Sequence, residues 1–248
     1  MSQQTKRVCL ITGGSRTLGA EIAQVLASNG IEIAINYNKS EHSAIDLSNK
    51  IKDSGIRAEI IRADVSEPKD AHKLVLKTLD LFGQIDILVN NAGPYVDDPY
   101  LELKLEDFDH IMNTNVRATY LISQIAGKAM KQRGSGNVIN IAATSAFDNR
   151  HTVYGLAKKG VIHLTKQLAT ELAPEIRVNA IAPGLIADNE DMSPKKRNEV
   201  LEKTPLGRLA TRKEIAEVLY SICGPSFDSV TGQTIIIDGG LNLGQSPI

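Results

Sequence analysis

Three things are scarce in this sequence: cysteine, an excess of charge of one sign, and long apolar runs. The 248 residues include two cysteines, Cys9 and Cys223, which are too few for a disulfide framework and typical of a reducing compartment. Lysine and arginine number 28 against 29 aspartate and glutamate, for a net charge of −1. No basic block stands out, which argues against a nucleic-acid partner. We therefore expect a cytoplasmic protein.

The apolar content is ordinary but dispersed. No stretch approaches the ~18 apolar residues of a membrane-spanning helix, and residues 1–7 are polar, so we expect neither a membrane span nor a targeting peptide. A chain that is 42% hydrophobic and 23% charged is typical of a folded globular protein. Its length suits one domain, which we place at residues 1–248.

Short apolar runs alternate with segments of helical periodicity. The runs are rich in β-branched residues and apolar at successive positions, as in strands buried on both faces of a parallel sheet. They cover 8–11, 31–35, 58–61, 85–89, 138–142, 177–181 and 234–237. The helical segments cover 18–28, 43–53, 70–82, 105–131, 153–172 and 213–223. This order predicts a doubly wound α/β (Rossmann) fold, a three-layer sandwich of about seven strands. Residues 183–212 lack clear periodicity and are predicted to form a substrate lid.

A glycine-rich turn joins the first predicted strand to the first helix. Such a turn lets backbone N–H groups and a helix N-terminus approach a pyrophosphate, although a plain tight turn also uses glycine. The predicted phosphate-binding residues are Gly13, Ser15, Arg16, Thr17, Leu18 and Gly19.

Several motifs together resemble the short-chain dehydrogenase/reductase family over residues 6–243, and most closely its 3-oxoacyl-[acyl-carrier-protein] reductase branch. They are the loop at 12–19, Asn90-Asn91-Ala92-Gly93, Tyr154-Gly155-Leu156-Ala157-Lys158 and Pro183-Gly184. Thr17 departs from the pattern, because the family usually has glycine there. The resemblance implies further cofactor contacts from Asp64, Val65, Asn91, Ala92, Gly93, Pro183, Gly184 and Ile186.

The end of the second predicted strand indicates which dinucleotide binds. A site for NAD places a carboxylate near the adenosine ribose, whereas a 2′-phosphate needs cations and neutral donors. No acidic residue lies between positions 34 and 40. Arg16 and Lys39 supply positive charge, and Asn38 and Ser40 supply donors, so we predict NADPH (NADP⁺). The alternative is that Lys39 is only a solvated turn residue.

Tyr154 and Lys158 are the predicted catalytic pair. Four residues apart in a helix, they share one face. The unperturbed pKa of a phenol is ~10, and a nearby cation lowers it, so we expect Lys158 to make Tyr154 a usable general acid. The resemblance implies that Lys158 also holds the nicotinamide ribose.

Two further catalytic residues are predicted from the resemblance. Asn115, inside a helical pattern, matches the asparagine at a helix kink that holds a proton-relay water, although a purely structural kink is an equal reading. The family also has a hydroxyl after the fifth strand that polarises the substrate carbonyl. Ala143 occupies that place here, so we predict that Ser145, or else Thr144, replaces it.

These residues predict an NADPH-dependent carbonyl reductase that acts on a small carbonyl or alcohol, and the resemblance names a 3-oxoacyl thioester as a candidate. The alternative is a dinucleotide-binding sensor or scaffold with lost or attenuated catalysis. The family commonly forms tetramers, so we expect a homo-oligomer, a tetramer or a dimer. The five histidines have no metal-ligand spacing, and no metal is predicted.

Overall fold

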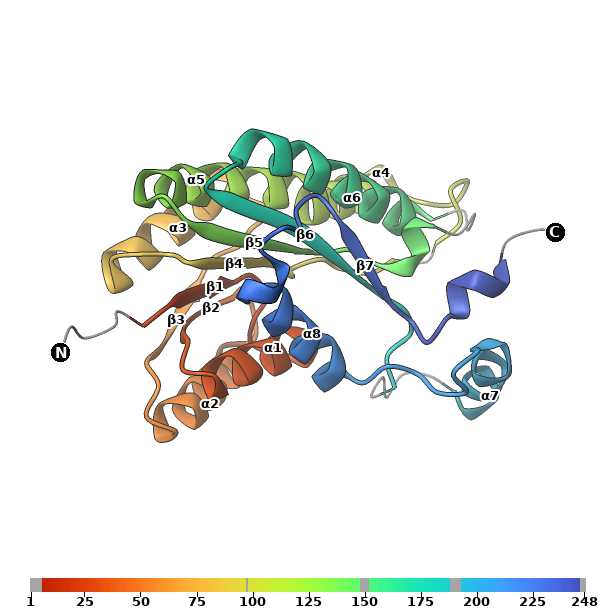
Figure 1. Ribbon diagram of the computed structural model, residues 1–248. Coiled ribbons are helices and arrows are strands. Elements are labelled where there is room, and N and C mark those ends of the chain that lie inside the picture. The colour runs from red at the N-terminus through yellow and green to blue at the C-terminus, as the bar shows by residue number, and fades with distance from the viewer. Residues whose placement is uncertain (1–5, 97, 148–151, 188–192, 246–248) are drawn as a thin grey trace.

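Seven parallel strands form one sheet in the order β3-β2-β1-β4-β5-β6-β7 (Figure 1). A computed structural model describes residues 6–96, 98–147, 152–187 and 193–245. The strands are β1 (Val8–Ile11), β2 (Glu32–Tyr37), β3 (Ala58–Arg62), β4 (Ile87–Asn90), β5 (Gly136–Ile141), β6 (Ile176–Pro183) and β7 (Thr234–Ile237). The predicted doubly wound fold with seven strands is confirmed.

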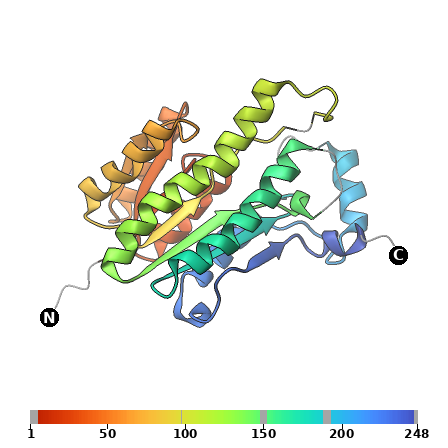
Figure 2. The same ribbon diagram turned by 90° about the horizontal axis from the view of Figure 1, so that it is seen from above.

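The helices cover both faces of the sheet (Figures 1 and 2). One face packs on α1 (Thr17–Ser28), α2 (Glu41–Asp53) and α8 (Arg212–Ile222). The other packs on α3 (Pro68–Phe82), α5 (Ala118–Arg133) and α6 (Val153–Leu172). Every residue of β1 and β4 is buried, as expected of strands that lie between two helical layers.

Two predicted segments differ in detail from the structure. The expected helix at 105–131 is divided into α4 (Leu105–Met112), a π-helical turn (Asn113–Arg117) and α5. The predicted lid at 183–212 contains the end of β6 and a helix, α7 (Pro194–Lys203). Residues 188–192 of that segment lie outside the described residues.

The connections at the two ends of the strands differ in length. At the amino ends of the strands, short turns follow the helices, and Gly83 and Gly134 end α3 and α5 with φ angles of 76° and 80°. Glycine is favoured there because a side chain is disfavoured in the left-handed region. At the carboxyl ends the connections that follow β4, β5 and β6 are longer than these turns. The order of the strands in the sheet reverses between β1 and β4, and open α/β sheets form their ligand crevice at such a point.

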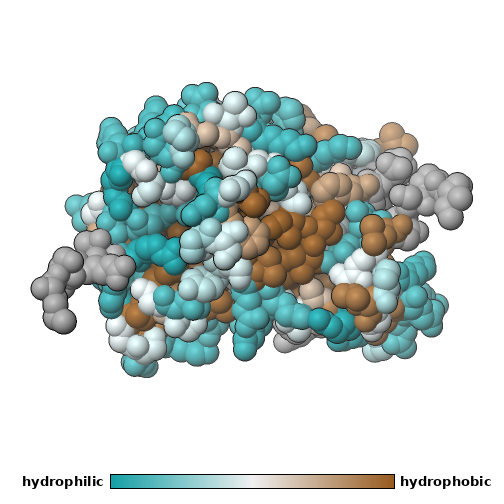
Figure 3. All heavy atoms as spheres, viewed as in Figure 1, coloured by the Kyte–Doolittle hydropathy of each residue, from teal (hydrophilic) through white to brown (hydrophobic). Residues whose placement is uncertain are grey.

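Strand β7 lies at one edge of the sheet, and its side chains are partly exposed. The space-filling view shows a hydrophobic area over this strand on the face seen in Figure 3. Ile236 contributes to the exposed apolar surface of the protein. This edge is therefore a candidate contact surface.

Candidate active site

A cleft of about 550 Å³ runs along the carboxyl edge of the sheet. It is lined by segments that follow β1 to β6 and by residues of α1, α4 and α6. The structure gathers 18 of the residues predicted above in its lining. They are Gly13, Ser15, Arg16, Thr17, Leu18, Asn38, Lys39, Ser40, Asp64, Val65, Asn91, Ala92, Gly93, Tyr154, Lys158, Pro183, Gly184 and Ile186. Gly19, Asn115 and Ser145 do not line it.

Hydrogen bonds to Asn36 fix the backbone of the loop after β1, and residues of this loop line the cleft. The N–H of Gly13 donates to Oδ1 of Asn36 at 3.0 Å, and the N–H of Gly14 donates to the Asn36 carbonyl oxygen at 2.8 Å. Asn36 is 2% exposed at the end of β2. A β-carbon at Gly13 would lie 3.1 Å from the Cα of Ala92, so the absence of a side chain lets the two loops approach.

Gly19 and Thr17 have different positions in this loop. A β-carbon at Gly19 would meet the Gly13 carbonyl oxygen and would lie 2.7 Å from Nδ2 of Asn91, so Gly19 permits close packing behind the loop. Thr17 adopts a φ of 49°, the left-handed region that a β-branched residue rarely occupies. Thr17, the first residue of α1, therefore has a strained backbone conformation at the cleft surface.

Hydrogen-bonding side chains surround the end of the cleft formed by the loops after β1, β2 and β3. The hydroxyls of Ser15 and Ser40 lie 2.7 Å apart, and Nδ2 of Asn38 donates to Asp64 at 2.9 Å. Burial alone would raise the pKa of Asp64, but hydrogen bonds from Ser66 and Asn38 outweigh it and hold the pKa below its usual range. Asp64 is therefore an anionic acceptor at neutral pH.

Tyr154 and Lys158 lie together at the other end of the cleft, in the first turns of α6. The Thr152 hydroxyl caps this helix by accepting the N–H of Gly155 at 3.2 Å. Nζ of Lys158 lies 5.4 Å from the Tyr154 ring centroid and donates to the Ile141 carbonyl oxygen at 2.7 Å. The lysine is 3% exposed, and burial lowers its pKa to about 8.

The pKa of Tyr154 differs from the sequence expectation. Burial raises it above its ordinary value, and Tyr95 raises it further; the two rings make an edge-to-face contact with centroids 5.0 Å apart. Lys158 does not offset this rise; its ammonium lies 5.4 Å from the ring centroid and donates to a backbone carbonyl. The phenol is therefore protonated at neutral pH.

Asn115 supports the wall behind Tyr154 and Lys158. Within the π-helical turn its Nδ2 donates to the Ile111 carbonyl oxygen at 3.0 Å, and its own carbonyl oxygen accepts the Thr119 hydroxyl at 2.7 Å. A β-carbon at Gly93 would meet Oδ1 of Asn115 and lie 3.1 Å from Nζ of Lys158. Asn115 thus does not line the cleft itself but lies behind Gly93, close to Lys158.

The predicted hydroxyl is not in the lining. Ser145 lies in a 3₁₀ turn (Thr144–Ala146), where its Oγ is buried and has no hydrogen-bond partner among the described residues. Ala143 lines the cleft in its place. The structure therefore does not bring Ser145 or Thr144 to the substrate position that the prediction required.

Other lining residues were missed by the sequence analysis. His110 and Thr114 reach the cleft from one face of α4 and the π-helical turn, and the buried Thr114 hydroxyl has no partner among the described residues. Their spacing of four was a usable signal. The remaining missed residues, which carried no comparable signal, are Asn36, Tyr37, Ala63, Pro94, Ile141, Ala142 and Ala143.

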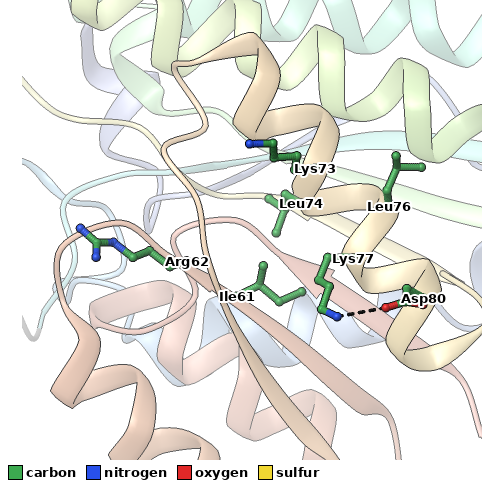
Figure 4. Close-up of a pocket in the computed structure, with 7 residues that line it drawn as sticks. All are labelled: Ile61, Arg62, Lys73, Leu74, Leu76, Lys77 and Asp80. Carbon is green, nitrogen blue, oxygen red and sulfur yellow. Dashed lines mark hydrogen bonds and ion pairs between the residues drawn. The ribbon is translucent and has the colours of Figure 1, made fainter.

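A second hollow, of about 440 Å³, lies between β3 and α3. Lys77 pairs with Asp80 at 3.0 Å, whereas Arg62 extends from β3 away from this pair (Figure 4). Binding sites bring polar groups toward one point, and these do not converge. This hollow therefore lacks the arrangement of a reactive site.

The geometry defines a class of protein: an open α/β oxidoreductase with a dinucleotide cleft and a Tyr/Lys pair at one end. The residues fit such a cofactor, because Gly13 and Gly93 line the cleft without side chains, and the buried Thr114 hydroxyl has no hydrogen-bond partner in the part of the chain that the structure describes. In the described residues no cluster of His, Cys, Asp or Glu could hold a metal ion, and no helix is long and apolar enough to cross a membrane.

Comparisons with known proteins specify the family. A family model described as enoyl-(acyl carrier protein) reductase matches residues 13–242. A 3-oxoacyl-[acyl-carrier-protein] reductase of Synechocystis is 35% identical over 97% of this chain and 99% of its own length. The chain belongs to the short-chain dehydrogenase/reductase family and is an oxidoreductase.

Two solved structures are similar throughout. A short-chain dehydrogenase/reductase of Serratia marcescens superposes with a TM-score of 0.90 at 32% identity, covering 96% of this chain and 99% of its own. A variant of actinorhodin polyketide ketoreductase with NADPH gives 0.89 at 28% identity, covering 98% and 99%. The second supports binding of a nicotinamide dinucleotide in this family's cleft.

Proposed function

We propose that this protein is an NADPH-dependent carbonyl reductase that converts a ketone to a secondary alcohol. The observation that carries the proposal is the position of Tyr154 and Lys158 at one end of a cleft whose opposite end has the phosphate-loop geometry. A binding protein has no need of a proton donor at that end. We therefore favour an enzyme over a sensor or scaffold.

Each group has a separate role in this reaction. NADPH, when bound, supplies the hydride. Tyr154 donates a proton to the substrate oxygen, and its phenol is protonated at neutral pH. Lys158 provides a buried donor beside Tyr154. Gly93 has no side chain, which leaves room for the Asn115 amide and the Lys158 ammonium next to the cleft.

We propose NADPH because of the side chains at the end of the cleft formed by the loops after β1, β2 and β3, where the adenosine would bind. Arg16 and Lys39 are exposed at the cleft, and the hydroxyls of their sequence neighbours Ser15 and Ser40 lie 2.7 Å apart. Cations and hydroxyl donors suit a 2′-phosphate. The carboxylate of Asp64 already accepts from Asn38 and Ser66, and we propose that its remaining acceptor capacity serves the adenine.

A 3-oxoacyl thioester is our candidate substrate, by similarity to the Synechocystis reductase. The family model's description names an enoyl reductase instead, so the test includes a 2-enoyl thioester. We also propose a lid at 183–212, residues 1–248 as one domain, and assembly as a homo-oligomer. A cytoplasmic location stays a prediction.

The decisive experiment measures NADPH oxidation by the purified protein with 3-oxoacyl, 2-enoyl, diketone, sugar and pterin substrates. Tyr154→Phe should lower kcat by about 10²–10⁴-fold, the typical contribution of general acid catalysis, while NADPH binding by fluorescence stays unchanged. Tyr120→Phe, which removes a hydroxyl on the exposed face of α5, is the matched control. If every carbonyl stays at background rate while NADPH binds, the protein is the sensor or scaffold instead.

Lys39→Glu tests the cofactor choice. A carboxylate there should repel the 2′-phosphate and accept from ribose hydroxyls, so the preference should shift toward NADH by at least about 10-fold, or about 1.4 kcal/mol. Lys73→Glu on α3 makes the same charge change away from the cleft and should leave the preference alone. An unchanged ratio of kcat/KM for the two cofactors in Lys39→Glu contradicts this account.

A further inference from the structure

Asn36 is a buried polar residue near the end of β2, where it follows three apolar residues, Ile33, Ala34 and Ile35. Burial of an amide is unfavourable unless its donor and acceptor groups are hydrogen-bonded. Asn36 also lines the cleft, although the proposed function gives its side chain no role. Its hydrogen-bond partners therefore indicate what the amide does.

The Asn36 amide joins two segments that follow different strands. Its Oδ1 accepts the N–H of Gly13, in the loop after β1, at 3.0 Å. Its Nδ2 donates to the carbonyl oxygens of Ala63 at 3.0 Å, Ile61 at 3.3 Å and Tyr37 at 3.3 Å. The partners fix the orientation of the amide, because an N–H needs an acceptor and a carbonyl needs a donor. One short side chain thus connects the phosphate loop to the end of β3.

The main chain of β2 holds the same two segments at adjacent points. The N–H of Gly14 donates to the Asn36 carbonyl oxygen at 2.8 Å, and the N–H of Ala63 donates to the Tyr37 carbonyl oxygen at 2.9 Å. A segment with one such bond can pivot about it, whereas a second bond at a neighbouring peptide group restricts its orientation, because hydrogen bonds are directional. The Asn36 side chain supplies that second bond to both segments.

Both segments belong to the lining of the cleft. Gly13 lies in the predicted phosphate loop, and Ala63 directly precedes Asp64, the carboxylate assigned above to the adenine. A dinucleotide spans both segments, since its pyrophosphate and its adenine are parts of one molecule. Its affinity therefore depends on the spacing of the two segments before it binds.

We infer that Asn36 is a positioning residue for the dinucleotide, because its amide fixes the spacing between the phosphate loop and the turn that carries Asp64. The inference rests on the proposed function and adds a residue to it. A site that is already ordered binds more tightly, since binding does not have to restrict the loops. Loss of the amide should weaken cofactor binding and leave the chemical step unchanged, because Tyr154 and Lys158 are positioned by α6.

Two substitutions test the amide. Asn36→Leu removes both sets of hydrogen bonds at similar size and without a new charge, whereas Asn36→Asp keeps an acceptor for Gly13 but offers no N–H to Ala63. Each should raise the Kd for NADPH, measured by fluorescence, and the KM for NADPH by at least about 10-fold, as expected when buried groups lose their partners. The kcat at saturating NADPH should change by less than about 3-fold, because the lost interaction acts on binding.

Asn179 on β6 is the matched control. It is 0% exposed, its Oδ1 accepts the N–H of Gln233 at 3.0 Å, and its Nδ2 donates to the Val230 carbonyl oxygen at 2.8 Å. It has the same bonding pattern as Asn36 but is not among the residues that line the cleft. Asn179→Leu and Asn179→Asp should lower the free energy of unfolding and leave the Kd and KM for NADPH at their wild-type values.

Circular dichroism establishes that each variant folds. The inference is overturned if a folded Asn36 variant binds NADPH as tightly as the wild type, if the loss is in kcat instead of Kd and KM, or if the Asn179 variants weaken NADPH binding equally. It is also overturned if neither Asn36 variant folds, because the residue is then a requirement of the fold itself. None of these results bears on the reductase function.

The proposed function fails separately. If the wild type binds NADPH and reduces no carbonyl, the reductase is refuted while the Kd values still test Asn36. If the wild type does not bind NADPH, the proposed function and the inference both fail.

Discussion

At the residue scale, Lys158 links catalysis to stability. Its ammonium is buried with a single backbone acceptor, and burial lowers its pKa from 10.5 to about 8. In the unfolded chain the group keeps its ordinary pKa. The unfolded state therefore binds more protons than the folded state between these two values, and the charged buried form costs stability at every pH below about 8.

We predict that Lys158→Met stabilises the protein at pH 7. The shift corresponds to at most about 3 kcal/mol, at 1.36 kcal/mol for each pH unit. The gain should shrink as pH rises above 8 and approach zero near 10.5, because the wild-type group then folds without losing a proton. Urea unfolding across this pH range measures the difference. The exposed Lys159→Met should show no such trend, and a gain independent of pH contradicts the burial argument.

At the scale of elements, α8 begins with a complete capping box. The Thr211 hydroxyl accepts the N–H of Glu214 at 3.2 Å, and the Glu214 carboxylate accepts the N–H of Thr211 at 2.9 Å. Hydrogen bonds from Arg208 and then Thr211 lower the pKa of Glu214 to about 2. The carboxylate is therefore charged at the helix N-terminus, where negative charge is favourable.

Thr211→Ala should lower the free energy of unfolding by about 1 kcal/mol, the usual cost of losing an N-cap side chain. Thr211→Ser keeps the hydroxyl and should stay close to the wild type. Urea unfolding at neutral pH distinguishes them. Equal losses in both variants would mean that the threonine methyl group, rather than the cap, stabilises α8.

The elements also explain which predictions succeeded. The strands were predictable because local composition decides them: β1 is apolar throughout, β4 is apolar except for Asn90, and every residue of both strands is buried. The interruption at Asn113–Arg117 was expected only from the family resemblance, which places a helix kink at Asn115; its backbone involves contacts between Asn115 and Pro94 or Ile111. Such contacts leave no periodic signal in the chain.

The same distinction applies to the cleft. The glycine loop and the Tyr/Lys pair are local motifs, and the structure gathers them in one lining. Asn36 was missed because its role is a hydrogen bond to Gly13 in another segment. Ser145 was chosen because it is near Ala143 in sequence, but one 3₁₀ turn is enough to direct its hydroxyl elsewhere. Nearness in the chain does not determine side-chain direction.

At the scale of the whole molecule, exposed apolar side chains lie on α5, α6 and β7. Tyr120 and Leu156 are exposed on the neighbouring helices α5 and α6 (Figure 2), and Ile236 is exposed on β7. Charged side chains placed inside an interface are strongly unfavourable. If helices and strand form two different contacts, Tyr120→Glu with Leu156→Glu should convert a tetramer to a dimer, as measured by light scattering.

Ile45→Glu, an equally apolar-to-charged change on the exposed face of α2, is the control and should leave the mass unchanged. A tetrameric mass that survives the double substitution would show that α5 and α6 are not the contact. A monomeric wild type would refute the predicted oligomer altogether.

The short glycine turns at the amino edge of the sheet have a practical consequence. The cleft residues all approach from the opposite edge, so arrival of reactant, exchange of coenzyme and departure of product share one side of the molecule. Gly134 is exposed, and nothing lies within 4 Å of where its β-carbon would be. If the protein is immobilised through a tether inserted at that turn, the cleft of every molecule should face the solution.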